Sequence, residues 1–399
     1  MHILLISRTF NITRQSSGYR AYELAKYFFI NGSRLDFLTA DPDDERPLSE
    51  LGRVTCSPYT LSKDCTFLRR MGRRLVYWPE PERALVRPWL AGLDPLLKNG
   101  APDAVLVTSP PHSIQIAGCR IGQMLAIPYF ADLRDDWISN NRLRWHSMLH
   151  MAVARRVERK IVLSASRVVL NTDIVHDRFA ERYPWSAHKM ITITNGYDEC
   201  DYCATVMDVT SGILQRVPSG KRLLFYGGSS YLGFMTMQLG NLARCILEGR
   251  MSRGWHIVTS GEGEWPPAEY AAVWTHLGML SPADFARVQQ ICNVLLLAMP
   301  PGENEPSGTV PLKAYGYLRS GTPIVYVGEA GATTDLLRKF TGTFALPRAE
   351  WPALYAFLVS NEDAFRKTSM SERRDIKSYS FEELAHTFLR VIREATNKE

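Results

Sequence analysis

Two successive runs of apolar strands and helices limit what this chain of 399 residues can fold into. The first run opens with the strand pattern His2–Ser7. The second opens with Arg222–Tyr226, which leads into the turn Gly227-Gly228-Ser229. Short apolar, β-branched runs that alternate with helical spacing are typical of parallel sheets covered by helices on both faces. The sequence therefore predicts an α/β protein with two Rossmann-like, doubly wound domains that face a central cleft.

The boundary between the two runs is marked by a loss of periodicity over Glu199–Ser219. We expect an N-terminal domain over residues 1–205 and a C-terminal domain over 206–375. We expect a last helix within 376–399 to pack back on the N-terminal domain, because its apolar residues share one helical face. These residues are Leu384, Phe388, Val391 and Ile392.

Composition restricts the class of partner. The 47 basic and 41 acidic residues give a net charge of +6, which suits anionic ligands or an anionic membrane surface and is too small to indicate nucleic acid. Apolar runs such as Val294–Met299 are far too short to span a bilayer, and the N-terminus lacks the features of a signal peptide. We expect a cytoplasmic protein with reduced cysteines.

Several motifs of known chemistry are absent from the sequence. The spacing from Gly228 to Gly233 matches a phosphate-binding P-loop, but Phe234 stands where the lysine is needed. No GxGxxG follows the first strand, and neither HExxH nor GxSxG occurs. The CxxC at Cys200 and Cys203 has no second pair or nearby histidines, so we expect no metal site.

In the first run, polar residues follow the strands. Ligands bind at the carboxyl ends of parallel strands, so we expect the loop Arg8–Gly18 to face the cleft. The strand Ala104–Thr108 precedes His112, and a strand beginning at Ile127 runs into DLRDDW. So many charges after a buried strand favour a functional role over simple solvation. The residues concerned are Asp132, Arg134, Asp135, Asp136 and Trp137.

Two further segments are rich in basic residues. Arginines alternate with apolar and aromatic residues over Leu68–Trp78, which suits a segment lying on an anionic membrane. A solvated basic face over the core explains that pattern as well, and nearby prolines interrupt it. A long helix around Ser147–Val162 carries a second group on its polar side, formed by Arg155, Arg156, Arg159 and Lys160.

In the second run, Glu305–Val327 has the pattern of a glycine-bearing loop, a short helix and a buried strand. Ser307 or Thr309 suits the N-cap of the helix, and Gly321 suits its end. Backbone N–H groups before a helix can bind an anion, and Lys313 would add a positive charge there. An ordinary loop–helix–strand unit would show the same local pattern.

Taken together, these segments resemble the retaining glycosyltransferases of family four, which have the GT-B fold. The likeness is strongest to the branch that builds bacterial surface polysaccharides on lipid-linked carriers, and it extends over nearly the whole chain. The matching segments are MHILLIS with the loop to Gly18, PDAVLVTSPP, IPYFADLRDDW, VVLNT, ITNGYD, LLFYGG, SGEG, HLGML and SGTVPLKAYGYLRSGTPIV.

The resemblance implies transfer of a hexosyl or N-acetylhexosaminyl group from a nucleotide diphosphate-sugar to a glycan or lipid-linked acceptor. Transfer would proceed with retention in O-antigen, capsule or exopolysaccharide biosynthesis, with the protein peripheral on the inner face of the membrane. No obligatory metal cofactor is expected, because backbone N–H groups and basic side chains would stabilise the departing diphosphate. The implied donor-binding residues are Gly227, Gly228, Ser229, Gly261, Glu262, Leu280, Glu305, Ser307, Gly308, Thr309 and Val310. The implied acceptor-binding residues are Arg14, Ser17, Gly18, His112 and Asn195.

The chain departs from the family pattern at two places. Many relatives carry paired glutamates where this chain has Gly308 and Gly316, and Glu303 or Glu305 could replace the first of them. Many relatives also carry a histidine at the end of the IPYFADLRDDW strand, where this chain has Arg134, and arginine cannot act as a general base at neutral pH. We therefore expect the arginine to bind phosphate or sugar, beside an aspartate that orients the acceptor or stabilises an oxocarbenium-like centre. The expected catalytic residues are Arg134, Asp135 and Lys313.

Two other functions remain open from the sequence. One is a nucleotide-sugar 2-epimerase of the same architecture, whose site would be richer in acidic and histidine side chains. The other is a non-catalytic GT-B scaffold in a polysaccharide assembly complex, which the loss of both glutamates favours.

Overall fold

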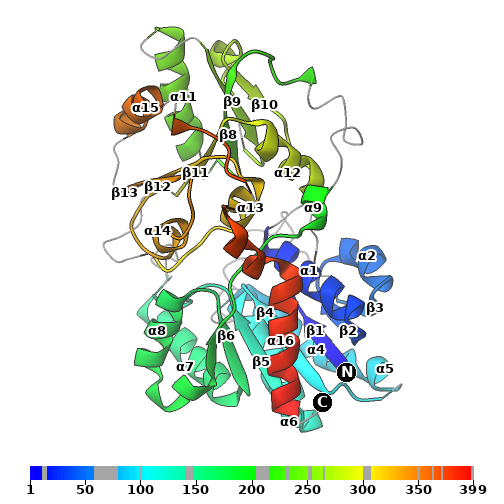
Figure 1. The fold of residues 1–399 in the computed structure, drawn as a ribbon. Coiled ribbons are helices and arrows are strands. Elements are labelled where there is room, and N and C mark those ends of the chain that lie inside the picture. Colours follow the sequence, from blue (N-terminus) through cyan, green and yellow to red (C-terminus); the bar gives the residue numbers. More distant parts are fainter. Residues whose placement is uncertain are drawn as a thin grey trace, which may run out of the picture. The chain divides into compact units, whose positions relative to one another are not determined.

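The computed structural model describes most of the chain, in two compact units. One unit consists of Met1–Asn195 with Phe381–Glu399, and the other of Gly196–Ser380 (Figure 1). The N-terminal domain was predicted to extend to residue 205. The described residues are 1–10, 16–57, 80–98, 100–139, 145, 147–203, 215–230, 233–249, 254–263, 266–299, 307–347, 351–361, 364–369 and 372–396.

Unit 1, which is Met1–Asn195 with Phe381–Glu399, contains a seven-stranded parallel sheet in the order β3-β2-β1-β4-β5-β6-β7. The order changes direction at β1, which lies between β2 and β4, as in doubly wound sheets. Its strands are β1 (His2–Ile6), β2 (Arg34–Thr39), β3 (Gly52–Cys56), β4 (Ala104–Ser109), β5 (Tyr129–Leu133), β6 (Arg167–Leu170) and β7 (Met190–Thr192). Its helices are α1 (Ser16–Ile30), η1 (Pro42–Asp44), α2 (Glu45–Ser49), η2 (Pro81–Leu85), α4 (Val86–Ala91), α5 (Leu93–Leu97), η3 (His112–Ile114), α6 (Gln115–Leu125), α7 (Met148–Ser164), α8 (Asp173–Arg182), η4 (Pro184–Lys189) and α16 (Phe381–Thr396).

Unit 2, Gly196–Ser380, contains a six-stranded parallel sheet in the order β10-β9-β8-β11-β12-β13. Here the order changes direction at β8, between β9 and β11. Its strands are β8 (Arg222–Gly227), β9 (Trp255–Ser260), β10 (Trp274–His276), β11 (Val294–Ala298), β12 (Ile324–Gly328) and β13 (Thr343–Pro347). Its helices are α9 (Cys200–Cys203), α11 (Phe234–Leu247), η5 (Ala268–Tyr270), α12 (Pro282–Ile291), α13 (Lys313–Ser320), α14 (Ala332–Leu337), α15 (Trp351–Ser360) and η7 (Arg374–Tyr379).

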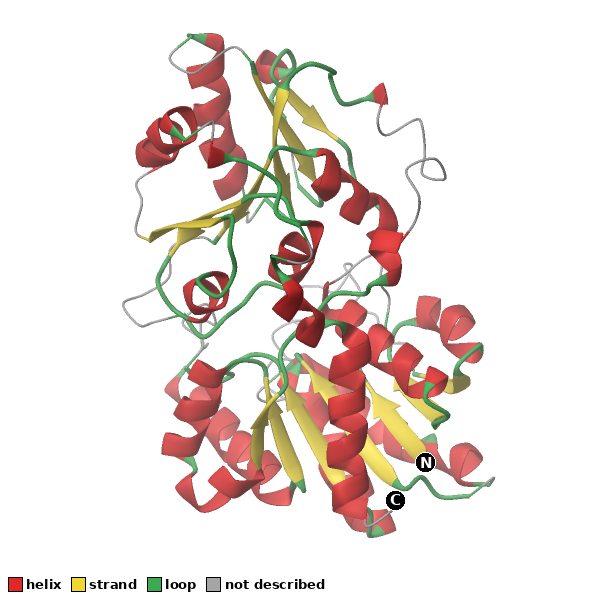
Figure 2. Ribbon diagram, in the orientation of Figure 1, coloured by secondary structure: helices red, strands yellow, loops and turns green. Residues whose placement is uncertain are grey.

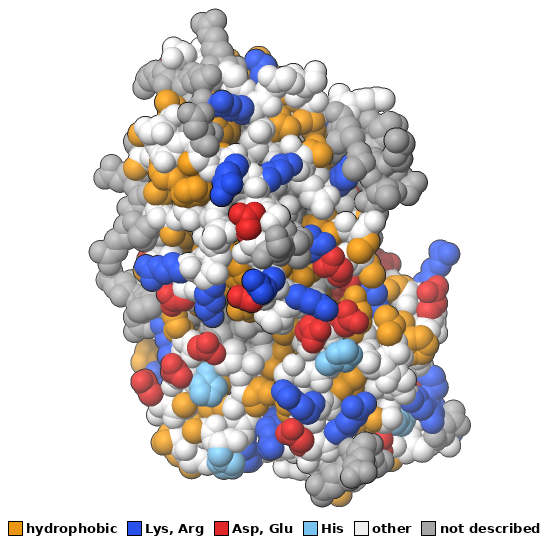
Figure 3. Space-filling model, viewed as in Figure 1, with side chains coloured by type: hydrophobic (Ala, Val, Ile, Leu, Met, Phe, Trp, Pro, Cys, Tyr) orange, Lys and Arg blue, Asp and Glu red, His pale blue; other side chains and the backbone are white. Residues whose placement is uncertain are grey.

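The prediction of two Rossmann-like α/β domains is confirmed. Helices cover both faces of each sheet (Figure 2). Every residue of β1, β4 and β11 is buried, as expected for strands that read as unbroken apolar runs. Among the described residues, no helix is long and apolar enough to cross a membrane. On the face drawn in Figure 3, basic and acidic side chains are interspersed.

The last helix belongs to unit 1, where it packs against α1. The ring of Phe388 lies edge-on to Phe28 at 6.2 Å between centroids, and Phe381 lies 5.6 Å from Tyr19. The apolar residues spaced along one face of α16 are buried in this contact. The amphipathic pattern of the C-terminal segment is therefore used to complete the first unit.

Two helix starts differ from the sequence predictions. Helix α1 begins at Ser16, so Gly18 lies inside a helix instead of a loop. Helix α13 begins at Lys313 with Leu312 at its N-cap, and no side chain caps it. The predicted cap Ser307 is instead engaged in an isolated parallel bridge with Gly331, which holds this loop extended. The predicted end of the helix is confirmed, because Gly321 follows it with a φ of 72°.

Candidate functional site

Glycine-bearing turns meet at the carboxyl edge of the unit 2 sheet. The N–H of Gly228, after β8, donates to the carbonyl of Ser260 at 2.8 Å, and the N–H of Gly261 donates to Gly278 at 3.1 Å. The predicted donor segments after β8 and β9 are thus brought together with the turn after β10. Exposed Ser229 and Glu262 and half-buried Leu280 lie along the same turns.

Two of these glycines are required by both backbone angle and space. Gly228 has a φ of 148° and Gly261 a φ of 127°, in the region that L-residues with side chains rarely adopt. A Cβ on Gly261 would lie 2.3 Å from the carbonyl oxygen of Gly228, and a Cβ on Gly228 would lie 2.9 Å from Nζ of Lys313. The turns therefore pack closely against one another and against a lysine ammonium.

That ammonium belongs to Lys313, the first residue of α13. Its Nζ is buried and has no hydrogen-bond partner among the described residues. It lies 4.1 Å from the centroid of the Tyr226 ring, a cation–π contact, and the Tyr226 hydroxyl is fixed by the Ser229 carbonyl at 3.0 Å. Burial lowers the pKa of Lys313 to about 7. The arrangement provides a hydrogen-bond donor for an anion, and a bound anion would favour the protonated form of Lys313.

In the loop before α13, some of the backbone N–H groups that were predicted to bind the diphosphate make hydrogen bonds within the protein. The N–H of Ser307 donates to the Ala330 carbonyl at 3.1 Å, and the N–H of Thr309 points to the Ser307 hydroxyl at 3.3 Å. The N–H of Ser307 is therefore not open to a ligand. Gly308 and Val310 lie in the same loop, whereas Glu303 and Glu305 lie outside the described residues.

Tyr202 occupies the space beside Gly316, where many relatives in the resembling family carry a glutamate. The Tyr202 hydroxyl oxygen lies 2.9 Å from the Gly316 carbonyl oxygen and 3.0 Å from Gln289 Oε1, so its single proton is shared between these two acceptors. A Cβ on Gly316 would lie 2.7 Å from the Tyr202 hydroxyl oxygen. Tyr202 of α9 therefore leaves no room for a glutamate side chain at position 316.

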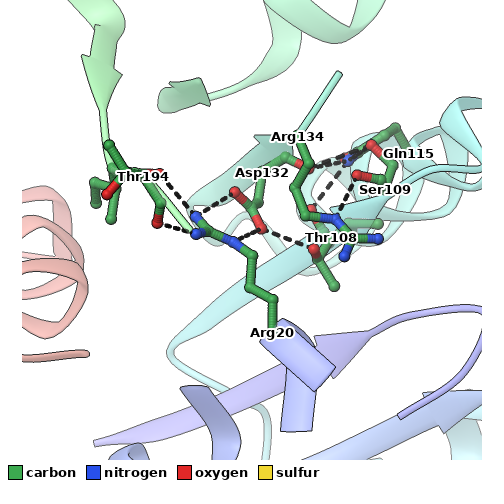
Figure 4. A network of polar contacts seen from close by, with 9 residues as sticks. Arg20, Thr108, Ser109, Gln115, Asp132, Arg134 and Thr194 are labelled. Atoms are coloured by element: carbon green, nitrogen blue, oxygen red, sulfur yellow. Dashed lines mark hydrogen bonds and ion pairs between the residues drawn. The ribbon is translucent and has the colours of Figure 1, made fainter. Parts of the chain in front are cut away.

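The carboxyl edge of the unit 1 sheet is organised by a buried ion pair (Figure 4). Arg20, on α1, donates from Nε and Nη2 to the two carboxylate oxygens of Asp132 at 3.1 and 3.0 Å. Thr108 donates to the same carboxylate at 2.7 Å, and Arg20 also donates to the carbonyls of Ile193 and Thr194. The charge of Asp132 is therefore neutralised inside the domain. The prediction that its carboxylate faces a ligand is wrong, because Arg20 and Thr108 already bind both carboxylate oxygens.

Asp136 and Trp137 are corrected in the same way. Asp136 accepts from the guanidinium of Arg182 on α8 at 3.2 Å, and Arg182 also donates to Glu158 of α7 at 2.7 Å. Trp137 is a buried core residue stacked on His112 at 5.1 Å between ring centroids. These residues hold the segment after β5 against the helices of unit 1.

Arg134 is the arginine of the DLRDDW segment that remains a site candidate. It follows β5 directly, is buried, and donates from Nε to the Ser109 carbonyl at 2.9 Å. Burial lowers its pKa, an effect that neighbouring Asp132 and half-buried Asp135 oppose. His112 lies against the same group, and burial together with the charge of Arg134 lowers the pKa of His112 to about 3. The imidazole is neutral near pH 7, so it can hydrogen-bond a ligand but not carry charge.

The remaining acceptor candidates are placed less completely. The side-chain oxygen of Asn195 is buried and has no hydrogen-bond partner among the described residues. Gly18 is buried within α1, while Arg14, the side chain of Ser17 and the basic segment Leu68–Trp78 lie outside the described residues. In the described part of the chain, no group of three or more His, Cys, Asp and Glu side chains could hold a metal ion.

Comparison with known protein families gives a match that covers most of unit 1. Residues 17–196 match the family described as Glycosyl transferase 4-like domain. Over this segment the chain is similar to glycosyl transferase 4-like domains. The domain runs from α1 to the end of the Ile193–Asn195 segment, so it includes Arg20, Asp132 and Arg134. No curated protein matches the sequence.

Solved structures extend the likeness to the whole chain. Sucrose-phosphate synthase from Thermosynechococcus elongatus is 12% identical with a TM-score of 0.69, and the match covers 98% of each chain. HepE from Anabaena, solved with UDP and glucose, is 14% identical with a TM-score of 0.65 and covers 99% of this chain and 100% of its own. A glycosyltransferase from Rickettsia africae is 13% identical with a TM-score of 0.64, covering 100% and 99%. These structures show that unit 1 and unit 2 have the two-domain GT-B fold.

Proposed function

We propose that the chain is a glycosyltransferase that transfers a sugar from a nucleotide diphosphate-sugar to a glycan or lipid-linked acceptor. The glycosyl transferase 4-like domain and the UDP-bound state of HepE, a protein of the same fold, support this proposal. The single observation that carries it in this chain is the buried Lys313 ammonium beside the turn at Gly228. A cation with no carboxylate partner in the described structure suits a diphosphate better than it suits the interior.

The chemistry follows from where negative charge develops. Breaking the bond between sugar and diphosphate places charge on the β-phosphate, and donors already in position stabilise it without reorganisation. Lys313 would contribute one charged donor, and the first turn of the eight-residue helix α13 would contribute its positive dipole end. The glycine turns would let the backbone approach the phosphates closely.

The glycosyl transferase 4-like domain would hold the acceptor. Arg134 would bind a phosphate or sugar oxygen, and Asp135 would orient the acceptor hydroxyl or stabilise an oxocarbenium-like centre. We propose hexosyl or N-acetylhexosaminyl transfer with retention, in bacterial surface polysaccharide biosynthesis, by a cytoplasmic protein at the inner face of the membrane. The matching segments named in the sequence analysis support this finer assignment.

A thermal-shift panel of UDP-, GDP-, ADP-, TDP- and CMP-sugars tests the donor site. Binding to the folded state alone raises the unfolding midpoint by mass action, so at least one nucleotide should raise it. The rise should be lost in Lys313→Met and kept in Lys339→Met, an exposed lysine of the same unit. A flat panel for the wild-type protein would contradict the proposal.

The accepted sugar then tests the reaction. Incubation with the donor and a lipid-linked glycan should yield a product whose anomeric proton coupling in NMR matches that of the donor, and Arg134→Ala should lose this product. Inversion of configuration would refute retention. Conversion of the donor sugar at C2 without any acceptor would instead identify an epimerase.

A further inference from the structure

Helix α7 of unit 1 (Figure 1) presents an unusual outer face. Eight of its residues are exposed, and at 100° per residue they fall within an arc of about 140°. The opposite stripe, which includes Ala154, Ile161 and Val162, is buried against the domain. The exposed residues, together called the α7 outer face, are Met148, Leu149, Ala152, Arg155, Arg156, Arg159, Lys160 and Leu163.

The charges on the α7 outer face are all of one sign. Its four basic side chains make no ion pair with an acidic side chain among the described residues. The acidic residue of this helix, Glu158, is buried and bound by Arg182 at 2.7 Å and by the Tyr183 hydroxyl at 2.8 Å. Like charges one helical turn apart repel one another, and an anionic partner would relieve this repulsion.

Large apolar side chains flank these charges. Met148 and Leu149 begin the helix with 75% and 59% of their surface exposed, and Leu163 near its end is 47% exposed. Trp185, in η4, is 50% exposed and lies under the guanidinium of Arg159, 5.4 Å from the ring centroid. Basic residues with exposed apolar side chains at both ends, and an indole beside them, are typical of a helix that lies in the headgroup layer of a bilayer.

We propose that the α7 outer face, with Trp185, binds the surface of a bilayer that contains anionic phospholipid. Anionic headgroups would neutralise the four cations, and the boundary with the acyl chains would bury the methionine, the leucines and the indole. Nucleic acid or an acidic polypeptide would satisfy the charges but would leave these apolar side chains exposed. The inference deepens the proposed function and rests on it, because α7 belongs to the domain proposed to hold a lipid-linked acceptor.

Co-sedimentation of the full chain with vesicles tests this surface. The protein should bind vesicles of phosphatidylglycerol and phosphatidylcholine, and it should bind phosphatidylcholine alone much more weakly. Arg155→Gln with Arg156→Gln should lower the partition coefficient roughly 30-fold, about fivefold for each charge. The matched control is Arg390→Gln with Arg393→Gln, which removes two exposed charges from α16 of the same unit. Because these charges lie outside the α7 outer face, the control should change the partition coefficient by less than about twofold.

A second pair of variants tests the apolar contribution. Leu149→Ser should lower binding to the anionic vesicles severalfold, whereas Met124→Ser, an exposed apolar residue on α6, should not. Equal binding by wild type and the α7 variants would overturn the proposal. So would equal binding to neutral and anionic vesicles, or retention by duplex DNA with none by vesicles.

The nucleotide-sugar panel on the same variants separates this inference from the proposed function. The α7 variants leave unit 2 unchanged, so their midpoint rise with nucleotide should equal that of the wild type. Normal nucleotide binding without vesicle binding would overturn only the membrane surface. Vesicle binding with a flat nucleotide panel would overturn only the donor site.

Discussion

The buried cations at the carboxyl edges of the two sheets differ in whether a carboxylate neutralises them. In unit 1, the buried Arg20 is bound by Asp132, and Arg182 is bound by Asp136 and Glu158. In unit 2, the buried ammonium of Lys313 lies over the Tyr226 ring and makes no hydrogen bond within the described structure. Both edges belong to parallel sheets of the same class, so the difference lies in the side chains and not in the architecture.

This difference distinguishes charges that stabilise a domain from a charge that we propose binds a ligand. A buried ion pair with its hydrogen bonds filled is costly to break, because the surviving partner is left charged in the interior. A buried lysine without a counter-ion lowers stability when charged, and such a residue is retained where function requires it. The predictions that follow test this contrast, from the largest expected effect to the smallest.

Breaking the Arg20 pair should have the largest effect. Asp132→Ala leaves the fully buried guanidinium of Arg20 without its carboxylate and should lower the free energy of unfolding by about 3–5 kcal/mol. The matched control is Asp335→Ala, which removes the exposed partner of Arg338 and should cost less than about 1 kcal/mol. Urea denaturation measures both, and equal effects would mean that the buried pair is not structural.

Adding a methyl group to the unit 2 turns should come next. Gly261→Ala combines an unfavourable φ with an approach to the Gly228 carbonyl, so we expect a loss of about 2–4 kcal/mol. Gly278→Ala also has a positive φ but meets no atom within 4 Å, and it should cost about 1 kcal/mol. A denaturation series in which the two variants agree would show that close packing of the turns is unimportant.

Removing the unit 2 cation should weaken nucleotide binding and not the fold. Lys313→Met should lower affinity for UDP, the first probe, about 10- to 100-fold, the value of a charged hydrogen bond of about 1.5–3 kcal/mol. The ligand-free protein should be equally stable or more stable, because the burial cost of a charge is removed. Calorimetric titration gives the affinity, with Lys339→Met as the unchanged control. A large loss of stability without ligand would make Lys313 a structural residue.

The pH dependence of that site should be the smallest effect. Because burial lowers the pKa of Lys313 to about 7, the ligand-free site loses its proton as pH rises through that value. UDP affinity should therefore fall between about pH 7 and pH 9, by roughly tenfold at most per pH unit. In Lys313→Arg the charge persists, so the decline should be absent. A wild-type affinity that does not change with pH would show that the ammonium stays charged.

The lowered pKa of Lys313 also determines the direction in which the free energy of unfolding changes with pH. Unfolded Lys313 titrates near 10.5, so between about pH 7 and that value the unfolded chain binds more protons than the native one. The contribution of Lys313 to the free energy of unfolding should therefore increase with pH over this interval and be constant below it. Subtracting the profile of Lys313→Met isolates this contribution in denaturation experiments.

The sequence was sufficient for features that depend on neighbouring residues. Apolar runs located the strands on either side of Lys313 because a parallel strand is buried on both faces. The start of α12 depends on local residues too, since the Ser281 hydroxyl caps this helix by accepting from the N–H of Asp284 at 3.1 Å. Gly321 was likewise correct, because the end of a helix is set by one residue of positive φ.

Features set by distant residues could not be predicted. Asp132 and Asp136 look like a ligand-facing cluster in sequence, yet Asp132 pairs with an arginine 112 residues away and Asp136 with one 46 residues away. Tyr202 fills the space beside Gly316 from 114 residues away. The predicted cap of α13 failed for the same reason, because Ser307 pairs with Gly331 across the turn after β12. In each case tertiary pairing outweighed the local pattern.

The packing of α16 on α1 has a consequence for how the protein is made. Unit 2 is one continuous segment, whereas unit 1 needs residues from both sides of it. During translation, the face of α1 that carries Phe28 stays uncovered until Phe388 leaves the ribosome, by which time all of unit 2 has been synthesised. The domain begun first is thus the one completed last, and its exposed helix is the place where chaperones would be expected to bind the nascent chain.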